Sequence, residues 1–148
     1  QTLEDICMKP KEPELKSEAE GVLTLRSTFK NSDVAMVFPG IVKILNIWNC
    51  SDNDKSMILG FESEEEFLTM HSDPEQHTFS DDQILRMSYI LNIYRALHNF
   101  FSNPESQNNW VNKPNKAAIF KSEPAIELMK SGGLSGLASV AHYLHSFP

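Results

Sequence analysis

The chain has few cysteines and no long apolar run. Its 148 residues include two cysteines, Cys7 and Cys50, too few for the disulfide framework of a small secreted domain or for a cysteine-rich zinc site. No apolar stretch approaches the roughly 20 residues that cross a bilayer, and no charged-then-apolar leader precedes the acidic start. We therefore expect a cytoplasmic protein with no membrane span.

Signals for β-strands are scarce as well. No run alternates apolar and polar residues for long, and no Asn-Gly or Asp-Gly turn separates two apolar runs. Helical spacing of apolar residues is frequent, and 41% of the residues are apolar, as in a globular protein. A chain of this length is expected to form one ordinary domain, or two small helical lobes that share a core. The sequence predicts an all-α fold.

Positive charge is limited and unevenly distributed. The net charge of -7 disfavours nucleic-acid binding by the whole surface, because such binding depends on lysine and arginine. Residues 51–82 contain ten acidic residues and one basic residue, a balance of -9, whereas residues 83–148 contain six basic and three acidic residues, a balance of +3. The two halves are expected to face different partners, or each other.

The first 79 residues divide into an arm and a group of short helices. Residues 1–20, in which Pro10 and Pro13 lie among mixed charges, predict a flexible arm. Residues 21–79 predict a helix-turn-helix-like region. Its expected helices cover residues 22–30, residues 39–48 opened by Pro39, residues 51–60 capped by Ser51 and ended by Gly60, and residues 62–71.

Residues 80–148 predict a long central helix followed by shorter ones. Ser80 and Gln83 have the spacing of a capping box, and residues 81–101 are apolar on most sides of a helix, so the other helices should pack against this one. Asn-Pro pairs and glycines, which interrupt helices, then separate the helices expected at residues 104–110, 124–130 and 134–147. Gly132 or Gly133 is expected to take a left-handed conformation at a helix end.

The sequence has no motif for catalysis or metal binding. His142 and His145 lie three positions apart, but no acidic or cysteine ligand lies near them in sequence, so we interpret them as surface or packing residues. In the segment 130–136 the Lys-Ser pair precedes the glycines, which is the reverse of a phosphate-binding loop. The glutamates at residues 62–66 lack calcium-loop spacing, and no nucleophile motif occurs. We expect a protein that is not an enzyme, without catalytic, metal or cofactor residues.

The expected helices at residues 51–60 and 62–71 have helix-turn-helix proportions. The second of them takes the place of a recognition helix. It carries four glutamates and no lysine or arginine, so DNA phosphates would repel it. DNA binding is therefore disfavoured and no DNA-binding residue is assigned, and self-association as a homodimer is the alternative role for this helix.

Four segments carry a resemblance to a known family. They are LNIYRALH at residues 91–98, WVNKPN at 110–115, SEPAIELM at 122–129 and GLASVAHYL at 136–144. From Phe38 to Phe147 the chain resembles the Xre/MbcA/ParS-type antitoxins, which neutralise RES-domain toxins. The family form has a Trp-Leu-x-x-Pro-Asn segment, a Ser-Pro segment and a final helix with Val and Leu. This chain departs from it after Asn115, where the family commonly has a glycine-rich turn, and at Glu123, which separates the serine from the proline.

The resemblance implies a helix-turn-helix of the Xre type followed by a helical module that binds a RES-domain toxin and blocks the entrance of its NAD-consuming site. The cofactor belongs to the toxin. Lysines on loops beside Trp110 and Phe120 have the character of a protein interface, with these two aromatic residues as its frame. The expected toxin-binding residues are Lys113, Asn115, Lys116, Lys121, His142, His145, Ser146, Phe147 and Pro148. The alternatives are a DNA-binding autorepressor and a stand-alone oligomerising protein.

Overall fold

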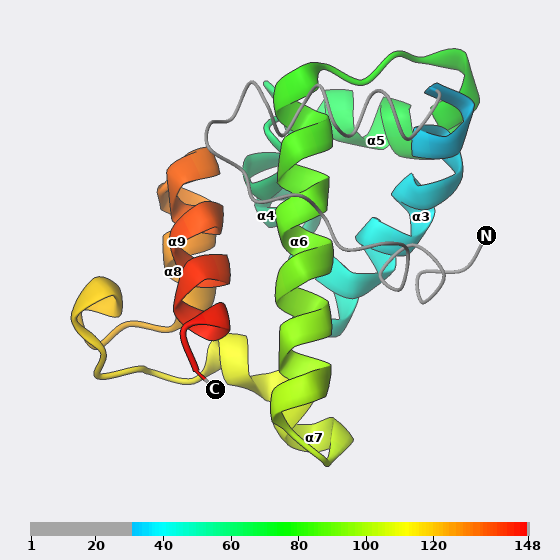
Figure 1. Cartoon of the computed structure of the whole chain (residues 1–148). Coiled ribbons are helices and arrows are strands. Elements are labelled where there is room, and N and C mark those ends of the chain that lie inside the picture. Colours follow the sequence, from blue (N-terminus) through cyan, green and yellow to red (C-terminus); the bar gives the residue numbers. More distant parts are fainter. Residues whose placement is uncertain (1–30, 148) are drawn as a thin grey trace.

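A computed structural model describes residues 31–147 of the chain (Figure 1). Seven α-helices and three short 3-10 turns make up this part, which contains an isolated bridge between Pro114 and Pro124 but no strand. The all-α fold expected from the sequence is confirmed. The arm at residues 1–20, the helix expected at residues 22–30 and Pro148 lie outside the described residues.

The first described helices lie in the region that the sequence predicts to be helix-turn-helix-like, and we keep that name for residues 31–79. They are α3 (Asn31–Ile47), α4 (Asp52–Leu59) and α5 (Glu64–Ser72), followed by the 3-10 turn η1 (Pro74–Gln76). As expected, Ser51 caps α4, since its hydroxyl accepts from the Asp54 N–H at 3.1 Å while its own N–H donates to the Asp54 carboxylate at 3.1 Å. Gly60 ends α4 at a φ of 80°, a left-handed conformation that glycine adopts without strain.

The expectation that Pro39 opens a helix is wrong. Helix α3 begins eight residues earlier, at Asn31, and Pro39 lies exposed in its interior. Proline lacks the N–H that the Ala35 carbonyl would accept, which costs a helix about 3 kcal/mol. The helix continues through Pro39 because buried residues lie at helical spacing on both sides of it. These residues are Val34, Ala35, Phe38, Ile41, Val42 and Leu45.

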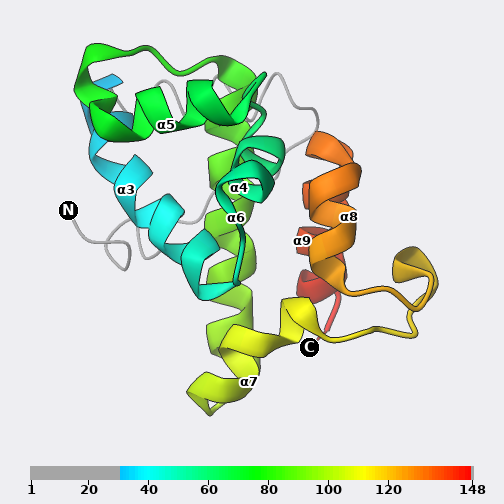
Figure 2. The same cartoon turned by 180° about the vertical axis from the view of Figure 1, so that it is seen from behind.

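Helix α6 (Asp81–Phe100) is the central element, as the sequence predicted. Its capping box is present, with the Gln83 N–H donating to the Ser80 hydroxyl at 3.1 Å and the Ser80 N–H donating to the Gln83 side-chain oxygen at 2.9 Å. Figures 1 and 2 show α6 running the length of the molecule, with α3 and α5 on one side of it and α8 and α9 on the other, while α4 crosses α6 between the two sides.

The C-terminal module follows α6 as short helices. They are α7 (Pro104–Asn109), η2 (Trp110–Asn112), η3 (Ala118–Phe120), α8 (Ala125–Ser131) and α9 (Gly133–His145). Of the two glycines considered at the α8–α9 turn, Gly133 takes the positive φ, at 61°. A Cβ on Gly132 would lie 2.6 Å from the Leu128 carbonyl oxygen, and glycine therefore permits the close packing of α8 on α9.

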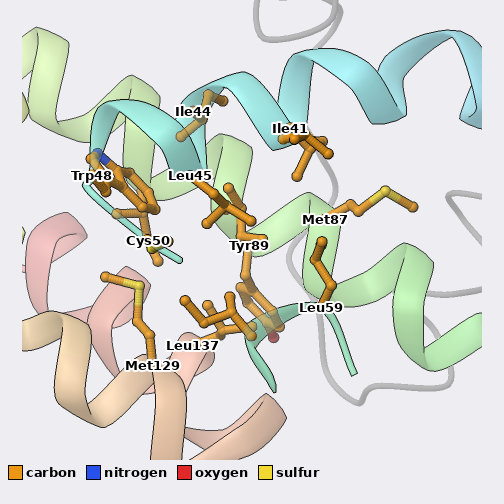
Figure 3. Packing of buried hydrophobic residues seen from close by; sticks show 14 of the residues in the cluster. Ile41, Ile44, Leu45, Trp48, Cys50, Leu59, Met87, Tyr89, Met129 and Leu137 are labelled. Carbon is orange, nitrogen blue, oxygen red and sulfur yellow. The ribbon is translucent and has the colours of Figure 1, made fainter. Parts of the chain in front are cut away.

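One hydrophobic core joins the two sides of α6. Figure 3 shows Trp48 and Cys50, at the end of α3, pointing toward Met129 of α8 and Leu137 of α9. Polar contacts also cross between the sides: the Asn112 amide donates to the Trp48 carbonyl at 2.8 Å, and the Lys130 ammonium lies 3.7 Å from the Asp54 carboxylate. The helix-turn-helix-like region and the C-terminal module are therefore packed as one body.

Within residues 31–147, no helix combines the length and the apolar character needed to cross a membrane.

Candidate functional site

Six aromatic side chains form a continuous strip at one end of the molecule, which we call the aromatic strip. Its members are Phe100, Phe101, Trp110, Phe120, Tyr143 and Phe147. They come from the end of α6, from η2 and η3, and from the end of α9 and the residues after it. In Figures 1 and 2 the lower end of α6, helix α7, the loop before α8 and the C-terminus lie toward the same end.

Tyr143 is the centre of the aromatic strip. Its ring lies 6.2 Å from Trp110 in a nearly parallel arrangement, 5.1 Å from Phe120 and 5.1 Å from Phe147, the last two edge-on. Trp110 and Phe120 also meet edge-on at 5.9 Å. These distances are in the range of favourable aromatic pairs, so the strip is held by mutual ring contacts. Phe120 is buried and Trp110 half-buried, which fits their expected place as the frame of the surface.

The outer part of the aromatic strip is open to solvent. Phe100 is 52% exposed and Phe147 is 41% exposed, and their rings meet edge-on at 5.4 Å. Phe100 also contacts Phe101, at 5.0 Å. A single exposed apolar residue is common on protein surfaces, whereas an exposed cluster rimmed by polar residues marks an interaction site. This pair is the strongest interface feature at the C-terminal end.

A loop that carries three lysines lies beside the aromatic strip, and we call residues 113–124 the cationic loop. Its base is closed by the bridge between Pro114 and Pro124 and by the Asn115 N–H, which donates to the Glu123 carbonyl at 3.3 Å. The Asn115 side-chain oxygen accepts from the Ala117 N–H at 2.9 Å. Asn115, one of the expected partner-binding residues, thus shapes the loop with its side chain, as asparagine commonly does in turns.

The lysines of the cationic loop are presented to solvent. Lys113, Lys116 and Lys121 are exposed, and the structure gives them no acidic partner among residues 31–147. Lys121 and Ser122 both have positive φ angles, 51° and 67°, which is uncommon for residues with a side chain. Two such residues in succession turn the chain sharply at the tip, next to Phe120 of the aromatic strip.

The expected residues of the last helix also lie at this end. His142 and His145 are exposed on α9, and the exposed Ser146 donates its hydroxyl to the Tyr143 carbonyl at 2.6 Å. Pro148 lies outside the described residues. Within the described part of the chain, no three His, Cys, Asp or Glu residues gather in a way that would hold a metal ion.

The aromatic strip is tied to the rest of the fold by two amide side chains. Gln107 of α7 donates to the Phe101 carbonyl at 2.8 Å, which fixes α7 against the end of α6. Asn112, two residues after Trp110, donates to the Trp48 carbonyl at the end of α3. The surface therefore rests on rigid elements rather than on a free tail, which lowers the entropy cost of binding.

A different surface lies on the helix-turn-helix-like region. In α5 the first turn carries Glu64, Glu65 and Glu66, and Leu68 is 45% exposed. A recognition helix contacts DNA mainly through residues near its N-terminus. In α5 that position holds three carboxylates, which DNA phosphates would repel.

Comparison with known proteins shows similarity to a protein whose activity is not assigned, and to no family model. No family model matches the chain. It is similar to the uncharacterized protein y4oB of Sinorhizobium fredii (strain NBRC 101917 / NGR234), with 27% identity over 123 residues, 81% of this chain and 92% of the relative. The similarity extends over nearly the whole relative, whose name assigns no activity.

Phe100 and Ile119 are surface residues that the sequence interpretation did not assign to the site. Phe100 was read as part of the packing stripe of the central helix, but it is the last residue of α6 and is exposed. Ile119, on the cationic loop, is also exposed. The available signal was their position: Phe100 is the last residue of the long helix and Ile119 lies in a short turn, and at such places a periodic apolar stripe no longer has to face the core.

Proposed function

We propose that the chain is an antitoxin that binds a RES-type, NAD-consuming toxin through the C-terminal end of the molecule and blocks its active site. The observation that supports this is the exposed end of the aromatic strip beside the cationic loop, which lies next to the segments that resemble the antitoxin family. Aromatic residues at the centre of a surface, with charged residues around them, are typical of protein interfaces.

The blocking step needs only steric occlusion and charge complementarity. Phe147 projects from the end of α9 and is supported by Tyr143, so the last residues form a short, anchored extension of the helix. Such an extension excludes substrate when its base is docked at the mouth of an active site. The chain contributes no catalytic group to this function.

The test is co-expression of the full chain with the product of its neighbouring gene, which the proposal expects to be a RES-type toxin, followed by purification and an assay of NAD consumption. The proposal requires a stable complex with NAD consumption suppressed. A complex that consumes NAD at the rate of the free toxin would disprove the blocking role.

A truncation separates blocking from binding. The variant should end at His145, because Ala141 and Leu144 are buried and a longer deletion would remove part of the core. Loss of residues 146–148 removes Phe147 and is expected to weaken the complex, and to release NAD consumption even at concentrations of the truncated chain at which the toxin remains bound. The matched control is Leu68→Ser, which changes an exposed apolar residue on α5 and should leave inhibition intact.

The second candidate is a DNA-binding autorepressor, favoured by the packed pair α4 and α5. It predicts binding of the full chain to DNA upstream of its own operon in a mobility-shift assay at low salt, lost when exposed residues of α5 are substituted. Absence of a shift at low salt, where phosphate contacts are strongest, would reject it.

A further inference from the structure

We infer that Phe100 and Phe147 together form the apolar centre of the docking surface, and that the surface fits an acidic protein partner with an apolar recess rimmed by carboxylates. The inference deepens the proposed function and rests on it in one respect, that this end of the molecule docks on a protein. It adds a residue of the central helix, Phe100, to the binding surface and defines the chemistry of the partner.

The first support is the way two distant segments meet. Phe100 ends α6 and Phe147 follows α9, 47 positions further along the chain, yet their rings lie 5.4 Å apart and both are largely exposed. The exposed residues Asn99, Ser102 and Ser146 flank the pair in sequence. An exposed apolar pair with polar neighbours has the organisation of an interface centre and its rim.

The second support is that the pair is preorganised. Phe147 is held by Tyr143, which packs against Trp110 and the buried Phe120, while Phe100 is held at the end of a twenty-residue helix and against Phe101. Rings that are already held in place lose little conformational freedom on binding, so the apolar area that they bury is retained as affinity.

The third support is charge, which decides between a second copy of this chain and a different partner. Lys113, Lys116 and Lys121 lie on the cationic loop, which is joined to the pair through Phe120 and Tyr143. A symmetric dimer through this surface would place the same surface, lysines included, on both sides of the interface. The lysines of the two copies would repel each other in such a dimer, whereas carboxylates on a different protein would attract them. The partner that this surface fits is therefore a protein with an acidic surface.

The first arm of the test uses the full chain and the dye 8-anilinonaphthalene-1-sulfonate, whose aromatic rings and single negative charge match the chemistry that we assign to the partner. Binding is followed by dye fluorescence and by backbone amide shifts of the 15N-labelled protein. We expect shifts concentrated at residues 98–103 and 143–147.

Phe100→Ser should remove most of the fluorescence enhancement of the dye, and the triple variant Lys113→Gln, Lys116→Gln, Lys121→Gln should weaken it. Leu68→Ser, an equally exposed apolar position in an acidic setting, should not change it.

Circular dichroism and the urea midpoint of each variant exclude dye binding to a loosened fold. Phe100 and Leu68 are both exposed, so neither substitution removes a core residue. Dye shifts located elsewhere, absence of dye binding, or an equal loss in Leu68→Ser would overturn the inference.

The second arm measures the affinity of the same variants for the RES-type toxin. Phe100→Ser should weaken binding by about tenfold or more, as for a residue at an interface hot spot, and Leu68→Ser should not. Toxin binding that is unaffected by Phe100→Ser overturns the inference and leaves the proposed function standing. If the wild-type chain does not bind the toxin, the proposed function fails, and the dye arm still decides the inference.

Discussion

Gly60 is a residue whose backbone conformation and surroundings both exclude a side chain. It ends α4 at a φ of 80°, and an added Cβ would lie 2.7 Å from the Arg86 Nε and 2.9 Å from the Asp82 carboxylate. Arg86 is fixed there because its guanidinium binds Asp82 at 2.8 Å and donates to the Met57 and Ile58 carbonyls, each at 3.3 Å. The arginine thus joins α6 to the C-terminal end of α4, where a positive charge is favourable.

Gly60→Ala is therefore expected to lower the free energy of unfolding by roughly 2 kcal/mol, from backbone strain and the close contact with Arg86. Urea denaturation of the variant and the wild type measures the change. In a background of Arg86→Ala the cost should be smaller, because the crowding side chain is gone. An equal cost in both backgrounds would show that the contact with Arg86 contributes nothing.

Cys50 is a buried thiol whose ionisation is coupled to folding. Burial, with the nearby Asp54 carboxylate as a second cause, raises the pKa of the thiol from 9.0 to about 12. In the unfolded chain the thiol loses its proton near pH 9, while the folded protein keeps it. The unfolded state then binds fewer protons than the folded state, so stability falls as the pH rises from about 9 to about 12 and is fully present below that window.

Cys50→Ala should flatten this pH dependence, since it removes the group that titrates differently in the two states. The measurement is the free energy of unfolding by urea at intervals between pH 8 and pH 11, for wild type and variant. Lys130, whose pKa is also raised, remains in both proteins: burial lowers its pKa, but the hydrogen bond to Glu127 and the charges of Asp54, Glu127 and Cys50 outweigh that effect, so the variant also loses the small contribution of Cys50 to the Lys130 pKa. Parallel curves for the two proteins would contradict the assignment.

At the scale of an element, α3 tolerates a proline because its buried face offsets the missing hydrogen bond. The Pro39 ring is exposed, whereas Phe38 and Ile41 beside it are fully buried. Phe38 contacts Phe61, Phe67 and Phe79, which brings three further segments of the helix-turn-helix-like region onto this helix. The tertiary contacts, not the local propensity, determine where α3 begins.

Pro39→Ala is expected to stabilise the protein, by up to about 3 kcal/mol, because the alanine N–H restores the bond to the Ala35 carbonyl in a helix that is already formed. A rise in the urea midpoint without a change in slope is the predicted result. Lys43→Ala, at an exposed position of the same helix, is the control and should have a small effect. A decrease in stability for Pro39→Ala would mean that α3 requires its proline.

At the scale of the whole molecule, the helix-turn-helix-like region and the C-terminal module share one core. Trp48 is buried at the end of α3, and its carbonyl accepts the amide of Asn112 from the other side of the molecule. Met129 and Leu137 reach the same cluster from α8 and α9. Neither half has a separate core, which makes independent unfolding of one half costly.

The two tryptophans make this testable, since Trp48 lies in one half and Trp110 in the other. In a Trp110→Phe variant, the fluorescence of Trp48 and the far-ultraviolet circular dichroism should follow the same urea transition, as two-state unfolding requires. Trp110 is half-buried, so the substitution keeps the core intact. Two separated transitions would show instead that the halves unfold independently.

Much of this architecture could be predicted from local patterns. The cap at Ser51, the capping box at Ser80, the end of α4 at Gly60 and the extent of α6 were expected and are confirmed, because each depends on residues within one or two helical turns. The start of α3 was predicted wrongly at Pro39, since a local rule for proline was outweighed by burial of a face that packs against distant segments.

For the candidate site, the sequence determined which residue types each segment provides: the lysines of the cationic loop, the aromatic residues around it and the acidic residues of α5. Only the tertiary structure decided which aromatic residues meet. Phe100 joins Phe147 across 47 positions because α6 and α9 pack side by side and end near each other, and no spacing rule along the chain encodes that meeting. The role of Asn115 in shaping the loop was also decided by the tertiary structure, since the folding of the loop brings the Glu123 carbonyl to the Asn115 backbone N–H.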